Sequence, residues 1–463
     1  MLDMNIIGAY AVPHPPLIIP EVGRGQEQNI QATADSYERI GRQVASQKPD
    51  VLVVISPHSV SYADYLHISP GSQAQGDFGS FGAPDIVVQT LYDQDFANQL
   101  CAHAEYHGIP AGFLGEKDPA LDHGTMIPLY FIQKYAGYIP IVRISISGLS
   151  YQHHYQLGQC ICQTAAAAGK RTVILASGDL SHKLREDGPY GFSMDGLLFD
   201  EKICNIFSKG DFSALLGIDE EFCEAAAECG HRSFVIMAGA LDGWNVESKL
   251  LSYQGPFGVG YAAAAFRPIG PSEDRKFLER HIREKERKRL ERKDQEDAWV
   301  RLARNSLEHY IQEGEHLPLP EGLPPEFYQE QAGAFVCLKI DGRLRGCMGT
   351  ILPVQSCIGE EIIENAVSAA VHDHRFSPVT LEELPLLTYS VDILGEPEPI
   401  QSIDQLDIEK YGVIVQSGLK RGLLLPDLAG VDTPQEQVRI ALEKAGISPY
   451  VDYTMERFEV VRH

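Results

Sequence analysis

Residues 51–58 read VLVVISPH, a short apolar run, mostly β-branched, that ends in proline and histidine. An uninterrupted run of this length and composition is typical of a strand that is buried on both faces of a parallel sheet. Similar runs occupy residues 6–12, 140–146 and 172–176. The segments between these runs that we predict as helices are residues 27–47, 93–107, 125–135 and 151–168. This alternation predicts an α/β domain in which helices cover both faces of a mostly parallel sheet.

Histidines follow three of the predicted strands. His14 and His58 each stand two residues beyond the end of a strand, and His182 stands six residues beyond another. His123 lies just before the predicted helix at residues 125–135. The carboxyl ends of parallel strands meet at one edge of a sheet, where ligands bind, and imidazole suits iron, zinc or copper. We therefore expect the four histidines to share one site, although for any single one a loop-capping role is the better interpretation.

Composition and charge disfavour several classes of partner. The net charge of −25 argues against binding to nucleic acid or to an anionic membrane. The chain has no apolar run of about 18 residues, and residues 1–10 carry no basic side chain, which argues against a signal peptide. The nine cysteines have no repeating spacing, so we expect reduced thiols rather than a secreted disulfide framework. The predicted location is the cytoplasm.

A charged segment divides the chain. Residues 272–297 hold 10 of the 39 Lys and Arg residues, interleaved with acidic ones and with hardly any large apolar side chains. Such a segment cannot bury a face, so we predict a solvated helix held by charge pairs four residues apart. A basic arm for nucleic acid is the alternative, but the interleaved acids argue against it. The predicted domains are therefore residues 1–270 and 298–463, joined by a helical linker at residues 271–297.

The part that follows the linker has a different pattern. Its predicted helices are residues 299–313, 358–372 and 433–445. Its predicted strands are residues 334–340 and 387–393, with a hairpin at residues 413–426. This pattern indicates a smaller α+β domain. Within it, residues 344–350, LRGCMGT, predict a tight glycine loop in which Arg345 would lower the pKa of the Cys347 thiol. An ordinary turn with a buried cysteine is the alternative.

Four short motifs carry a resemblance to a known family. In chain order they are PHPP at residues 13–16, SPH at 56–58, DHG at 122–124 and SGDLSH at 177–182. Together they resemble the class III extradiol dioxygenases of the LigB type and the Memo-like proteins, over residues 5–268. The resemblance implies that His14 and His58 bind Fe(II), with Glu228 as third ligand. It also implies a small-molecule substrate, an aromatic diol or a related compound, with His182 as the base that takes a phenolic proton. His123 would hydrogen-bond the substrate or the oxygen.

The third metal ligand has a second candidate. Memo-like proteins carry a cysteine near this place, and Cys229 follows Glu228 directly. A thiolate would favour copper or zinc and would disfavour oxygenation. Two functions are therefore open. One is an Fe(II) dioxygenase, and the other is a non-catalytic or redox protein that binds iron or copper and interacts with a partner. We also expect Asp179 to orient the His182 ring.

The C-terminal part resembles the AMMECR family over residues 298–462. The motifs that carry this resemblance are LRGCMGT at residues 344–350, the segments 365–370 and 378–384, and DHRF at residues 373–376. Its possible site is the cleft around Arg345 and Cys347. The fusion of Memo-like and AMMECR-like domains resembles the AmmeMemoRadiSam system, which implies a separate radical SAM protein as partner. This chain itself has no Cys-x3-Cys-x2-Cys motif.

Overall fold

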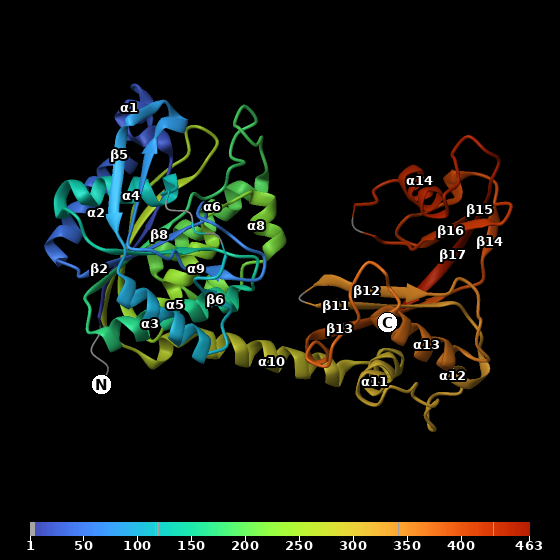
Figure 1. The fold of residues 1–463 in the computed structure, drawn as a ribbon. Helices are drawn as coiled ribbons and strands as arrows, with labels where there is room; N and C mark the ends of the chain where they lie inside the picture. Colours follow the sequence, from blue (N-terminus) through green and yellow to red (C-terminus); the bar gives the residue numbers. More distant parts are fainter. Residues whose placement is uncertain (1–4, 116, 118–119, 341, 429) are drawn as a thin grey trace. The chain divides into compact units, whose positions relative to one another are not determined.

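The structure, a computed structural model, describes residues 5–115, 117, 120–340, 342–428 and 430–463 (Figure 1). The chain forms two compact units, residues 1–286 and 287–463, and helix α10 (Phe277–Gln295) contains the division between them. Across the described ranges, no helix combines the length and the apolar character needed to cross a membrane.

The N-terminal unit is built on a six-stranded sheet. In spatial order its strands are β7 (Ile141–Ser145), β2 (Val51–Ser56), β8 (Thr172–Ser177), β1 (Ile6–Val12), β10 (Tyr261–Pro271) and β9 (Trp244–Gln254). The first four run parallel to one another, whereas β10 pairs antiparallel with β1 and with β9. The sheet is therefore mixed, and the expectation of a mostly parallel sheet holds only for β7, β2, β8 and β1.

The β9–β10 hairpin was not predicted. For β9, the pattern of exposed and partly buried residues explains why. Residues of β9 alternate between partly buried and exposed positions along the strand, as expected where one face of an antiparallel pair meets solvent. The run of β2, which is buried throughout, and that of β1, buried at all but one position, contrast with this pattern. Their bounds match the predicted segments, because an apolar run without polar interruption marks both ends of a strand.

Helices cover both faces of the parallel part of the sheet. On one face they are α3 (Gln94–Tyr106), α5 (Tyr151–Ala168) and α9 (His231–Ala240), and on the other α2 (Gln31–Gln47) and α4 (His123–Ala136). Successive strand residues point to opposite faces. In β2, Val53 and Ile55 therefore join the core beneath the first set, and Leu52 and Val54 join the core beneath the second. The prediction of helices on both faces is confirmed.

Further elements surround this sheet. They are the hairpin of β4 (Gln73–Phe78) and β5 (Ala83–Leu91), the pair β3 (Leu66–His67) and β6 (Ala111–Gly112), and the helices α6 (Met194–Lys209), α7 (Ser213–Leu216) and α8 (Glu220–Ala226). Helix α8 and the turn that follows it lead into α9, so this turn lies at the start of a helix that packs on the sheet.

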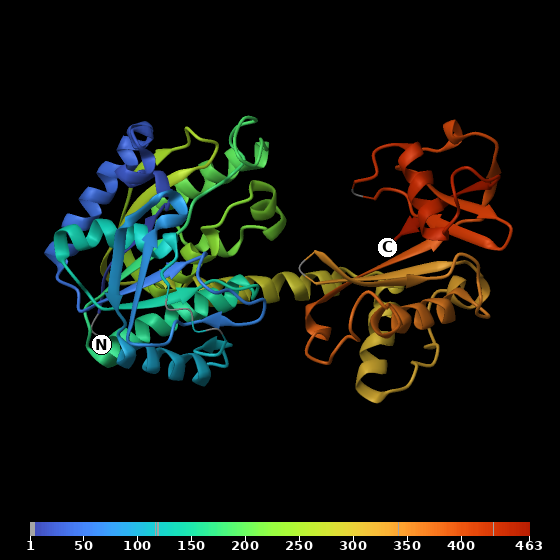
Figure 2. The same ribbon diagram turned by 45° about the horizontal axis from the view of Figure 1, so that its top comes forward.

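The C-terminal unit is α+β, as predicted, with a seven-stranded sheet (Figure 2). Its strands are β11 (Ala334–Ile340), β12 (Arg343–Gly349), β13 (Leu387–Leu394), β14 (Glu398–Ile400), β15 (Tyr411–Ser417), β16 (Lys420–Leu424) and β17 (Thr454–Arg462). Its helices include α11 (Ala298–Glu313), α13 (Ile358–Val371) and α14 (Pro434–Ala445). The strand pairings are antiparallel. Helices α11 and α13 share a core with β11 and β13, and α14 shares another with β15 and β16.

One prediction for this unit is wrong. Residues 344–350 were expected to form a tight loop, but most of them lie in strand β12. Gly346 is not required by a turn, and close packing explains why a glycine stands there. A Cβ atom there would meet the Ala369 carbonyl oxygen of α13 at 2.0 Å, so the glycine allows the helix to approach the strand.

Candidate metal centre

His14 is held from two sides at the end of β1. Its backbone N–H donates to Asp179 Oδ1 at 2.7 Å, and its ring Nδ1 lies 2.9 Å from Ser177 Oγ. Both partners come from the end of β8, the parallel neighbour of β1, where Val12 is in register with Ser177. An imidazole that donates through Nδ1 keeps a lone pair on Nε2. The His14 ring, only 2% exposed, is therefore fixed, and in the tautomer that donates to Ser177 its Nε2 is available as a ligand.

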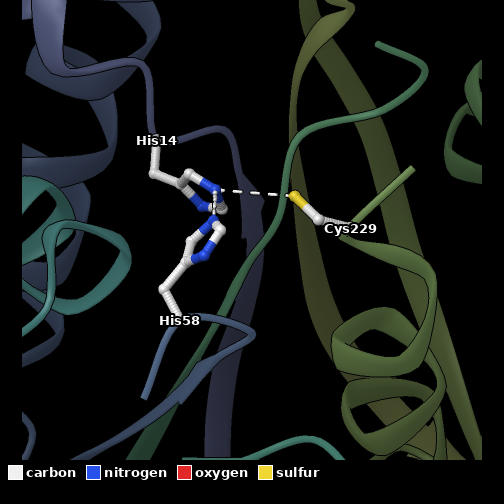
Figure 3. Close-up of side chains that lie close together, drawn as sticks. All are labelled: His14, His58 and Cys229. Carbon is white, nitrogen blue, oxygen red and sulfur yellow. Dashed lines mark hydrogen bonds between the residues drawn. The ribbon is translucent and has the colours of Figure 1, made fainter. Parts of the chain in front are cut away.

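Two further donor atoms face His14 Nε2 (Figure 3). His58 Nε2 lies 2.9 Å from it and Cys229 Sγ lies 3.6 Å from it. The three donor atoms all lie within 4.8 Å of one another. Because His14 is buried, Cys229 partly buried and His58 exposed, the group is anchored in the protein and accessible from the His58 side.

The chemistry of this donor set fits a transition-metal ion. Two imidazoles and a thiol suit copper, zinc or iron. Burial lowers the pKa of His14 well below its ordinary value, and partial desolvation of its ring lowers the pKa of His58, although that residue is exposed as a whole. Both rings are therefore neutral near pH 7, which is the form that binds a metal. Burial, with the charges of Asp179 and Glu228, raises the pKa of the Cys229 thiol well above its usual value. A cation held by the two rings would favour its thiolate.

Glu228, the alternative third ligand, lies in a different cluster. Its Oε2 accepts a hydrogen bond of 2.6 Å from the His231 backbone N–H. A carboxylate oxygen of Glu228 groups with Cys223 and His231. Of the two candidates, the structure therefore brings Cys229, and not Glu228, to the pair of imidazoles. Nothing in the local sequence distinguishes these adjacent residues.

His123 is in ring contact with the donor pair. It is the first residue of α4, whose N-cap Asp122 accepts from the Thr125 backbone N–H. Its ring stacks on His58 with centroids 4.3 Å apart and meets the His14 ring edge-on at 5.2 Å. Burial, followed by the charge of His58, lowers the pKa of His123 to about 4. The ring is thus a neutral hydrogen-bonding group beside the site.

His182 lies in the same electrostatic neighbourhood. Burial lowers its pKa to about 4, and the charge of His58 contributes to that shift. Its Nε2 is buried and makes no hydrogen bond with any residue that the structure describes. The Tyr190 ring packs beside it, with centroids 5.2 Å apart. A neutral imidazole nitrogen to which no described residue hydrogen-bonds can accept a proton from an incoming molecule. The structure is compatible with proton transfer by His182 but does not test it, so this role stays a prediction.

The prediction that Asp179 orients the His182 ring is wrong, because Asp179 contacts other residues. Its carboxylate holds the His14 backbone, and its own N–H donates to Cys229 Sγ at 3.3 Å. Burial raises its pKa to about 7. Asp179 therefore braces two of the proposed ligands and not the His182 ring, which comes three residues later on the same loop. Ser177, whose contact with His14 was also missed, ends the strand beside β1, so the parallel register was the signal that could have identified it.

The predicted C-terminal thiolate is also wrong. Cys347 forms a disulfide with Cys337, because the two residues are directly opposite each other in the β11–β12 pair. Arg345 makes a two-point contact with Glu383, with Nε to Oε1 at 2.7 Å and Nη2 to Oε2 at 2.9 Å. Its guanidinium is thus engaged by a carboxylate, and Cys347 is not a free nucleophile.

Two family models match the two units of this chain separately. Residues 8–264 match the family described as the catalytic LigB subunit of aromatic ring-opening dioxygenase, and residues 300–463 match AMMECR1. Protein CA_C1420 of Clostridium acetobutylicum is 40% identical over 469 residues, 99% of each chain. A Thermotoga maritima protein is 47% identical over 171 residues, 35% of this chain and 98% of its own. An uncharacterized protein from Escherichia coli K12, solved by crystallography, covers 56% of this chain and 99% of its own at 16% identity, with a TM-score of 0.37.

Proposed function

Because the chain belongs to the LigB family, matched over residues 8–264, with an AMMECR1 domain at residues 300–463, we propose that its N-terminal domain binds one redox-active metal ion. The proposed ligands are His14, His58 and Cys229, and we propose copper as the metal in preference to iron. The observation that carries the proposal is the approach of Cys229 Sγ to 3.6 Å from His14 Nε2.

The donor set favours copper for a simple chemical reason. Fe(II) oxygenases use two histidines and a carboxylate, whereas soft thiolate ligands favour Cu(I) or zinc. In this chain the third donor beside the two imidazoles is the thiol of Cys229, and the Glu228 carboxylate accepts a hydrogen bond elsewhere. When bound, copper would supply one-electron exchange between its Cu(I) and Cu(II) states. A redox or metal-handling role therefore agrees better with these residues than ring cleavage does.

The surrounding residues would set the geometry of the ligands. Ser177 and Asp179 restrain His14, and the stacked His123 ring restrains His58. Outer partners of this kind fix ring orientation, and their loss costs about 10–100-fold in metal affinity. His182 would hold or release a proton at Nε2 beside the site.

The test is the copper content of the full-length protein after anaerobic loading with Cu(I). We expect the His14→Ala/His58→Ala double variant to lose one equivalent per chain relative to the wild type. Cys229→Ser should weaken copper binding by at least about 100-fold, because even an outer-shell partner contributes about 10–100-fold. Cys160→Ser, which alters a buried thiol of α5 outside this group, is the matched control. Equal copper in the double variant and the wild type would overturn the proposal.

A second candidate function is an Fe(II)-dependent dioxygenase acting on an aromatic diol. It is favoured by the Nε2 of His182, for which the described residues provide no hydrogen-bond partner. Oxygen uptake by Fe(II)-loaded protein with a panel of catechols distinguishes the two functions. If ring cleavage occurs, His182→Gln should keep its metal and lose about 10²–10⁴-fold in turnover, the usual contribution of a general base. Loss of metal in that variant would make His182 a ligand, and no uptake with any diol would leave the copper proposal alone.

A further inference from the structure

Cys223, Glu228 and His231 form a second group of side chains that could bind a metal ion. Cys223 lies on α8, Glu228 in the turn after it, and His231 at the first position of α9. One Sγ, one carboxylate oxygen and one ring nitrogen from these residues lie within 4.8 Å of one another. Cys223 is 5% exposed and His231 is fully buried. The three donors come from one short segment, residues 223–231, and share no residue with the proposed copper site.

The His231 ring supplies an independent sign that a ligand belongs there. Its Nε2 lies 3.0 Å from the Leu215 carbonyl oxygen, which can only accept, so Nε2 carries the proton. The ring is fully buried, and a neutral imidazole that donates through Nε2 has its lone pair on Nδ1. That Nδ1 atom is buried and has no hydrogen-bond partner within the described part of the chain. Leaving such a buried acceptor unsatisfied is unfavourable in a folded protein.

A bound cation would satisfy this nitrogen. Metal-ligating histidines commonly donate through the other ring nitrogen to a backbone carbonyl, as His231 does to Leu215. Zinc takes thiolate, imidazole and carboxylate ligands at about 2.0–2.3 Å, which brings donors of one ion to about 3.5 Å from one another. The three donor atoms lie within 4.8 Å of one another, so one ion could bind all three once they move inward. One thiolate and one carboxylate would neutralise the charge of a divalent ion.

We propose that Cys223, Glu228 and His231 form a second, structural site for a divalent cation of the zinc type. Tyr151 would support it, because its hydroxyl donates to Cys223 Sγ at 3.4 Å and its ring meets the His231 ring edge-on at 4.5 Å. The site would close the turn between α8 and α9.

The turn between α8 and α9 links this second site to the proposed copper site. Glu228 is bonded directly to Cys229, so a cation that holds Glu228 also holds the backbone that presents the Cys229 thiol to His14. The second site would therefore act as a positioning element for the first. It does not depend on the first, since the two sets of donors are separate.

The test uses a His14→Ala/His58→Ala/Cys229→Ser variant of the full chain, which lacks the proposed copper ligands. Co²⁺ is the probe, because it occupies zinc sites and its thiolate complexes absorb by sulfur-to-cobalt charge transfer. We expect one Co²⁺ per chain with this absorption, displaced by Zn²⁺. Adding Cys223→Ser should abolish the band, and adding Cys160→Ser should leave it. No band in the triple variant, or a band that survives Cys223→Ser, would overturn the proposal.

Two measurements on otherwise wild-type protein keep the test independent of how the triple variant folds. Cys223→Ser should lower the Zn²⁺ bound at saturation by one ion per chain, whereas Cys160→Ser should not. Tyr151→Phe should weaken Zn²⁺ binding by about 10-fold, the lower end of the effect of an outer-shell partner. Unchanged Zn²⁺ stoichiometry in Cys223→Ser together with normal copper loading would reject the second site and leave the first intact.

Discussion

Replacing the buried carboxyl group of Asp200 by an amide tests how the loop that carries His182 is held. Asp200 is 1% exposed. One of its oxygens accepts from the Ser181 backbone N–H at 2.7 Å and the other from the Tyr253 hydroxyl at 2.8 Å. Burial raises the pKa of Asp200 from 3.8 to about 7, although both hydrogen bonds act in the opposite direction. Asparagine has the same shape and can still accept from Ser181, but it carries no charge at any pH.

The sign of the effect follows from where the proton is held. Between about pH 4 and pH 7 the folded protein keeps a proton on Asp200 that the unfolded chain has released. The unfolding free energy of the wild type therefore falls as the pH rises through this range and levels off above it. A tenfold change in proton affinity equals about 1.4 kcal/mol, so a pKa raised from 3.8 to about 7 corresponds to about 4 kcal/mol. We expect Asp200→Asn to match the wild type near pH 4 and to exceed it by up to about 4 kcal/mol at pH 8.

Urea unfolding at a series of pH values measures this difference. Trp244 lies on β9 in the N-terminal unit and Trp299 on α11 in the other, so a Trp299→Phe background makes the fluorescence report on the N-terminal unit. Glu201→Gln, at the exposed neighbouring position, removes the same charge and serves as control. A stability difference that does not grow with pH would refute the burial argument. If Asp200→Asn were less stable than the wild type at pH 8, the hydrogen bonds from the Ser181 N–H and the Tyr253 hydroxyl would require a charged carboxylate.

Two further substitutions test contacts that the fold depends on. In Gly178→Ala, the new Cβ would lie 2.1 Å from Gly230 Cα, so we expect a loss of about 1–3 kcal/mol in urea unfolding and weaker copper binding. Gly270→Ala, whose Cβ would meet no atom of the described residues within 4 Å, should change neither. In Cys337→Ser, opening a disulfide between residues ten apart should destabilise the C-terminal unit by about 3 kcal/mol. Alkylation of Cys337 and Cys347 without reductant, detected by mass spectrometry, would contradict that pairing.

The parallel strands and the first two histidines could be predicted because the information is local. Strands β1 and β2 have the predicted bounds, since their apolar runs are interrupted only at their ends. A histidine two residues beyond such a strand must lie at the carboxyl edge of the sheet, and His14 and His58 do so, with their Nε2 atoms 2.9 Å apart. Strand β9 lacks such a signal, because its partly buried and exposed residues also suit a loop or an amphipathic helix.

Contacts that depend on tertiary register could not be predicted. Cys337 and Cys347 become partners only when the β11–β12 register places them opposite each other. Glu228 and Cys229 are adjacent, and their side chains reach different clusters because of the turn that follows α8. That turn begins at Ala227, a non-glycine residue with a positive φ of 51°, a conformation that composition does not reveal.

The contact between two glycines explains how the proposed copper site is assembled from distant parts of the chain. Gly178 follows β8 and Gly230 precedes α9, and the space between their backbones leaves no room for a side chain on Gly178. On either side of Gly178, Ser177 and Asp179 hold His14, and the residue before Gly230 is Cys229, whose thiol accepts from the Asp179 N–H. The distance from thiol to imidazole is therefore set by direct packing of the two backbones. It follows that the site should be sensitive to substitutions that change none of its ligands, and that a cation holding Glu228 would act through this same contact.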